Sequence, residues 1–87
     1  MHTSGLVITF TADPVLASGA QGELTVAGPF TLGEARGPRQ AVTLETTDPK
    51  ATHDWHDWAE ALSGVENVEV VFVHWDDENA EVAHAGA

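Results

Sequence analysis

The chain has 87 residues, 43% of them hydrophobic, which predicts one small folded domain rather than a disordered segment. It has no cysteine, which excludes a disulfide framework and thiolate chemistry, and it has no run of ~20 apolar residues that would span a membrane. The chain has three basic and fourteen acidic residues, a formal net charge of −11. This charge argues against binding to nucleic acid or anionic lipid and favours cationic partners. The alternative is that the acidic residues serve solubility or adaptation to a cytoplasm of high salt concentration.

The first part of the chain reads as a strand followed by a helix. Residues 6–11 alternate apolar and mostly polar positions, as in a half-buried strand. Asp13 and Pro14 then form a helix start, because Asp is a good N-cap and Pro is favoured at the first helical position. Residues 23–26 taken alone also suit a strand. We predict a helix because apolar residues recur at helical spacing, namely Leu16, Ala20, Leu24 and Ala27.

The middle of the chain predicts a β-hairpin. Gly28 and Pro29 interrupt the preceding helix. Residues 30–35 suit a short edge strand, and residues 40–47 are a stronger strand with Val42 and Leu44 on one face. The turn between these two strands is residues 36–39.

A second helix is expected after Asp48 and Pro49, which repeat the start signal. Gly64 marks the expected end of this helix. One helical face is apolar and includes two tryptophans, which we expect to close the core between helix and sheet. This stripe consists of Ala51, Trp55, Trp58, Ala59 and Leu62.

The most strand-like run of the sequence is residues 64–75. With a period of two, one face is wholly apolar and is expected to be core. That face holds Val68, Val70 and Phe72. The other face begins with a carboxylate and then turns apolar, which is unusual for a face that meets water. It holds Glu69, Val71, Val73 and Trp75.

The order β-α-β-β-α-β predicts an α+β, ferredoxin-like fold, in which a four-stranded antiparallel sheet carries two helices on one face. We expect the domain to be residues 1–78, with a flexible acidic tail at residues 79–87. The side under the helices is predicted to hold Leu6, Ile8, Phe10, Val42, Leu44, Val70 and Phe72. The open side is predicted to hold Val7, Thr9, Thr11, Ala41, Thr43, Glu45, Glu69, Val71, Val73 and Trp75. This open face suits either ordinary solvation or a docking platform.

No catalytic set is recognisable: the sequence lacks a phosphate-binding glycine-rich loop and a nucleophile motif. We therefore expect neither an enzyme nor a cofactor. His53 and His56, with Asp54 and Asp57, have a spacing that suits a shared metal ion on a helix. The more ordinary interpretation is an exposed helix face, so we expect no metal site.

Several segments taken together resemble the NapD family, the small cytoplasmic chaperones of periplasmic nitrate reductase. A His and a Ser lead into an apolar strand in residues 1–8, and Pro14 opens the first helix. Residues 42–46 are an apolar strand that includes an acid. Residues 64–75 run from a Gly-Val turn to an aromatic next to a histidine, and residues 76–78 are acidic.

The resemblance implies a non-enzymatic chaperone that binds the twin-arginine signal peptide of the nitrate reductase catalytic subunit and delays export until the molybdenum cofactor is inserted. The expected apolar contacts are Val7, Thr9, Thr43, Val71, Val73 and Trp75, and the residues expected to attract the two arginines are Glu45, Glu69 and Asp76. The start of the chain lacks the basic region of a secretory signal, so we expect a cytoplasmic protein. We expect a monomer or weak dimer without nucleic-acid binding or membrane insertion. The alternative is a ferredoxin-like interaction module that oligomerises through its open sheet face without a peptide ligand.

Overall fold

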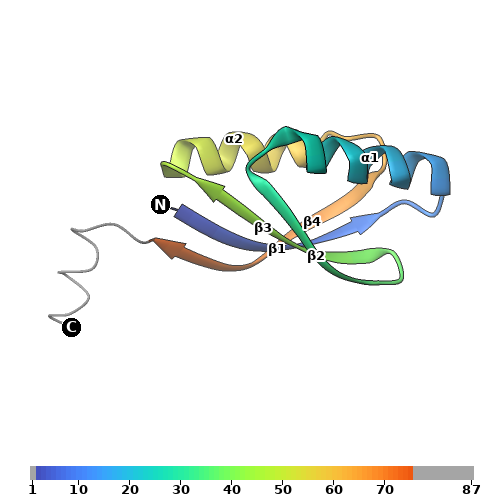
Figure 1. The fold of residues 1–87 in the computed structure, drawn as a ribbon, viewed down its shortest axis with the longest axis horizontal. Coiled ribbons are helices and arrows are strands. Elements are labelled where there is room, and N and C mark those ends of the chain that lie inside the picture. Colours follow the sequence, from blue (N-terminus) through green and yellow to red (C-terminus); the bar gives the residue numbers. More distant parts are fainter. Residues whose placement is uncertain (1, 76–87) are drawn as a thin grey trace, which may run out of the picture.

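A computed structural model describes residues 2–75 of the chain. The elements are β1 (His2–Phe10), α1 (Pro14–Ala27), β2 (Phe30–Arg36), β3 (Arg39–Thr46), α2 (Pro49–Glu60) and β4 (Val65–Trp75). The strands form one antiparallel sheet in the order β2-β3-β1-β4, and both helices lie on the same side of it (Figure 1). The predicted ferredoxin-like α+β plan is therefore confirmed. The tail predicted at residues 79–87 lies outside the described residues.

Both helices begin where the sequence predicts. The Asp13 carboxylate accepts hydrogen bonds from the backbone N–H groups of Val15 and Leu16, at 2.9 and 3.3 Å. The Asp48 carboxylate accepts one from the N–H of Ala51 at 2.7 Å. These side chains satisfy backbone donors that have no partner within the first turn, and the proline that follows each Asp has no N–H to satisfy.

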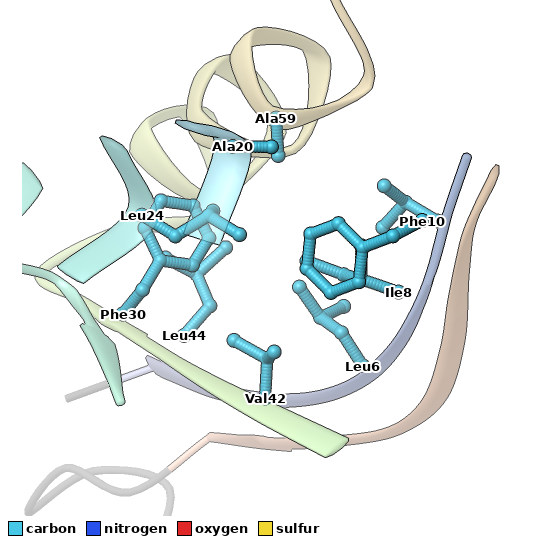
Figure 2. Packing of buried hydrophobic residues seen from close by; sticks show 10 residues of the cluster. Leu6, Ile8, Phe10, Ala20, Leu24, Phe30, Val42, Leu44 and Ala59 are labelled. Atoms are coloured by element: carbon cyan, nitrogen blue, oxygen red, sulfur yellow. The ribbon is translucent and has the colours of Figure 1, made fainter. Parts of the chain in front are cut away.

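The core lies between the helices and the covered face of the sheet. Leu6, Ile8 and Phe10 project from β1 toward the helices (Figure 2), as their alternation predicts. The remaining buried apolar residues come from every other element and are Ala20, Leu24, Phe30, Val42, Leu44, Ala59 and Val68. The central position of β1 in the sheet explains why it supplies three of the ten.

The two tryptophans of α2 close one side of this core. Trp55 and Trp58 are partly buried and lie 5.8 and 5.9 Å from the ring of Phe30, measured between ring centroids. The two indoles meet edge to face at 5.3 Å. Such aromatic contacts add to the apolar area that the rings bury. The predicted role of these tryptophans as a core ridge is confirmed.

The first strand is longer than predicted, since it begins at His2 rather than Leu6. Its added residues pair with β3 on one side and β4 on the other. The hydroxyl of Thr52 in α2 lies 2.6 Å from Nδ1 of His2, which ties this start to the second helix. No helix within residues 2–75 is long and apolar enough to cross a membrane.

Candidate functional site: the open face of the sheet

The sheet face away from the helices is the candidate site. Directly opposite residues of paired antiparallel strands project to the same side. Leu6 and Ile8 of β1 lie under the helices, so the residues that alternate with them along β1 point to the open face. The residues opposite these on β3 and β4 point to the same face. The register assigns to this face Thr3, Gly5, Val7, Thr9, Thr31, Arg36, Arg39, Ala41, Thr43, Glu45, Asn67, Glu69, Phe72 and His74.

A β-bulge in β4 changes which residues reach this face. Leu6 pairs with Val70, but its neighbour Gly5 pairs with Phe72, so Val71 is an extra residue without an opposite partner. One extra residue inverts the inside–outside alternation of the strand beyond it. The predicted alternation therefore holds for Val70 and fails for the residues after Val71.

The bulge corrects two of our predictions. Phe72 was predicted under the helices, but it lies opposite Gly5 on the open face. Val73 was predicted on the open face as a peptide contact, but it lies opposite the buried Ser4, toward α2. Both placements were wrong for one reason, since a strict period of two does not allow for an inserted residue.

Phe72 and Gly5 form the apolar centre of the open face. A Cβ placed on Gly5 would overlap the Phe72 ring, so the ring rests on the backbone where a side chain is missing. Phe72 is still 53% exposed. An aromatic side chain that packs against a strand and stays half exposed is a preformed surface for an apolar ligand.

Both signs of charge lie beside this aromatic centre. Glu69 of β4 and Arg39 of β3 form an ion pair across β1, with 3.7 Å between Oε1 and Nη2. Glu45 is exposed opposite Thr3. The predicted anionic residues Glu45 and Glu69 are thus brought to one face, but Glu69 already contacts a cation of its own chain.

A shallow hollow of about 250 Å³ lies next to Arg39. It is lined by Val7, Glu34, Arg36, Arg39, Gln40 and Ala41. Arg36 pairs with Glu34 at 3.5 Å. Two of the three basic residues of the chain therefore gather at this end of the open face, whereas Glu45 lies opposite Thr3 at its other end.

On the helix side, Val73 lines a groove between β4 and α2 of about 340 Å³. Ser4, Val70, His53 and His56 also line it. The hydroxyl of Ser4 is buried and has no hydrogen-bond partner among the described residues. Val73 is thus separated from the predicted peptide contacts Val7, Thr9 and Thr43, which share the open face.

The histidines of α2 each lie beside a carboxylate one turn further along the helix, rather than together as the alternative of a shared metal ion would require. Nδ1 of His53 lies 3.4 Å from Asp57, and Nδ1 of His56 lies 3.6 Å from Glu60. Ligand atoms of His56, Asp57 and Glu60 come within 4.8 Å of one another, without His53. This is the geometry of overlapping i,i+4 pairs on a helix surface. Nearby, the hydrogen bond and charge of Asp54 raise the pKa of Lys50.

The last two predicted site residues lie at the limit of the described chain. The backbone of Trp75 pairs with His2 at the end of β4, and the Trp75 side chain is outside the part that the structure describes. Asp76 lies outside the described residues altogether. Their predicted contacts with a peptide stay predictions.

Sequence reasoning missed Phe72 and Arg39 as open-face residues. The signal for Phe72 was Gly5, because an isolated glycine in a strand often marks a bulge or a close approach by another group. Arg39 was assigned to a turn, although it continues the alternation of Ala41 and Thr43. Extending β3 by one residue would have placed it on the open face.

Comparison with known proteins adds no further evidence, because no family model matches the chain and no curated protein is significantly similar to it.

Proposed function

We propose that this chain is a cytoplasmic chaperone that binds the twin-arginine signal peptide of a periplasmic nitrate reductase on the open face of its sheet. The observation that carries the proposal is the exposed ring of Phe72, held on Gly5 and bordered by the carboxylates of Glu45 and Glu69. The resemblance to the NapD family provides the identity of the ligand.

The chemistry of this face suits both parts of such a peptide. A twin-arginine signal joins a pair of guanidinium groups to an apolar, helix-prone segment. Phe72 and Val7 offer apolar area to that segment. Glu45 and Glu69 offer carboxylates, which form strong charge-assisted hydrogen bonds with guanidinium. The net charge of −11 draws a cationic peptide toward the chain.

The contact set that we propose keeps five of the nine predicted residues and changes those from Val71 onward. Val71 is the extra residue of the bulge and has no opposite partner, so we leave it out, while the contacts of Trp75 and Asp76 stay predictions. Phe72 replaces Val73, because the bulge at Val71 exchanges the faces of these two residues. Val7, Thr9, Thr43, Glu45 and Glu69 share the open face with Phe72, so we retain them.

A calorimetric titration with a synthetic twin-arginine peptide tests the proposal. We expect binding that weakens at higher salt and is lost when both peptide arginines become alanine. Phe72→Ala should weaken binding about tenfold, since complete burial of such a side chain contributes roughly 1.5–3 kcal/mol and about half of Phe72 is already buried in the free chain.

Val73→Ala is the matched control for Phe72→Ala. Val73 is adjacent to Phe72 in sequence and has a similar exposed fraction, 57% against 53%, but it lies on the helix side. Its substitution should leave the affinity unchanged. Equal losses in both variants, or no binding by the native chain at either salt concentration, would contradict the proposal.

Glu69→Lys tests the electrostatic part of the site. It reverses the charge of a carboxylate beside the aromatic centre, so we expect weaker binding that is also less sensitive to salt. Unchanged affinity at low salt would remove Glu69 from the site.

A second candidate function is an interaction module that associates with its own copies. It is favoured by residues 70–73 of β4, four consecutive exposed apolar residues on a strand at the edge of the described sheet. Such an edge is prone to pair with another strand. Light scattering over a range of concentrations distinguishes the two functions, because a stable dimer that excludes the peptide would favour the second.

A further inference from the structure

The ion pair between Arg39 and Glu69 lies where a ligand's arginine is expected to bind. Arg39 is opposite Thr9 and Glu69 is opposite Val7, so the pair crosses β1 diagonally on the open face. Both side chains are exposed, at 59% and 57%. The 3.7 Å separation in an exposed setting is typical of a pair that opens readily.

From this geometry we infer that Arg39 is an internal competitor, whose guanidinium occupies the Glu69 carboxylate and must be displaced by an arginine of the bound peptide. This inference rests on the proposed function, which it deepens by naming a residue that sets specificity. The chain has only three basic residues, so a guanidinium paired with a predicted site carboxylate is not a general feature of its surface.

The competitor has a consequence for selectivity. A peptide without arginine leaves the pair between Arg39 and Glu69 closed, since it offers nothing in exchange. A peptide with arginine replaces the Arg39 guanidinium by its own. The binding free energy then gains only the difference between the new ion pair and the pair between Arg39 and Glu69. Removal of Arg39 should therefore strengthen binding of the arginine peptide alone, because Glu69 then starts without a cationic partner.

Arg36 provides a matched control. It also lies at the hairpin end of the open face and pairs with a carboxylate, but that carboxylate is Glu34 rather than Glu69. Arg39→Gln and Arg36→Gln remove the same charge from the same hollow. Any general electrostatic gain for a cationic peptide is therefore common to both variants.

The test is a titration of the native chain, Arg39→Gln and Arg36→Gln with the twin-arginine peptide and with its double-alanine form. We expect Arg39→Gln to bind the arginine peptide roughly two- to fivefold more tightly than Arg36→Gln does, the range set by an exposed ion pair. With the double-alanine peptide the two variants should not differ. Circular dichroism of each variant verifies that the fold is retained.

Three other outcomes would overturn the inference. Equal affinities of the two variants for the arginine peptide would show an effect of net charge only, while binding by the native chain would leave the proposed function standing. Weaker binding by Arg39→Gln would show that Arg39 contacts the peptide directly. Absence of binding by the native chain and both variants would overturn the proposed function and the inference together.

Discussion

The two halves of β4 differ in what their apolar residues do. In this first half, residues 65–70, the alternation follows the sequence from Asn67 to Val70, with Val68 buried against the core and Glu69 on the open face. Beyond the bulge at Val71 the alternation is inverted, and both Phe72 and Val73 are more than half exposed. The same residue types thus stabilise the fold in one half and remain available for contact in the other.

The difference arises from what covers each half. The first half starts at Gly64, whose backbone lies against the carbonyl of Leu16 in α1 and whose own carbonyl accepts a hydrogen bond from the N–H of Thr11 at 2.9 Å. The second half runs along Ser4 and Gly5 of β1, where a missing side chain leaves room for Phe72. The first half of β4 is thus held by close packing of Gly64 against α1, whereas in the second half Gly5 leaves space for the Phe72 ring.

The largest effect is expected from Gly64→Ala. The new Cβ would overlap the backbone carbonyl of Leu16 and approach Cβ of Ala20, neither of which moves without shifting α1. We expect the free energy of unfolding to fall by about 3 kcal/mol. Urea denaturation followed by tryptophan fluorescence measures this change.

Gly19→Ala is the counterpart of Gly64→Ala. Gly19 lies inside α1, where an added Cβ meets no atom within 4 Å. Alanine is the better helix former, so this variant should gain up to about 1 kcal/mol of stability. If both glycine variants changed stability alike, close packing at Gly64 would not be what fixes the first half of β4.

A smaller contrast is expected between Val68→Ala and Val73→Ala. Val68 is 7% exposed and belongs to the core, so truncation should cost about 2 kcal/mol of unfolding free energy. Val73 lies beyond the bulge, so its truncation should lower the free energy of unfolding by no more than about 0.5 kcal/mol. Comparable losses in the two urea denaturation curves would mean that the second half of β4 is part of the core.

A smaller loss than that of Val68→Ala is expected from Gly5→Ala, because the Phe72 ring that meets the added methyl group is half exposed and can turn away. We expect a loss of about 1 kcal/mol. In a Phe72→Ala background the same substitution should instead be neutral or stabilising by up to about 1 kcal/mol, since alanine is less costly than glycine within a strand. The coupling energy from this double-mutant cycle reports the ring–backbone contact, and additive effects would contradict it.

Most of the fold could be predicted because its signals are local. Asp13-Pro14 and Asp48-Pro49 cap both helices as expected, since capping involves only residues within one turn. The tryptophan stripe of α2 also follows from spacing alone. The candidate site was predictable only in part: Val7, Thr9, Thr43, Glu45 and Glu69 share the open face as expected.

The sequence by itself determined the order of the elements, the starts of the helices and the residues of β1 that enter the core, because each depends on neighbours within a few positions. The tertiary structure alone decided that Val71 forms a bulge, that Phe72 rather than Val73 reaches the open face, and that Arg39 pairs with Glu69. These features depend on the register between β1 and strands distant in sequence. That register is set by where Gly64 packs on α1 and where Gly5 admits an aromatic ring.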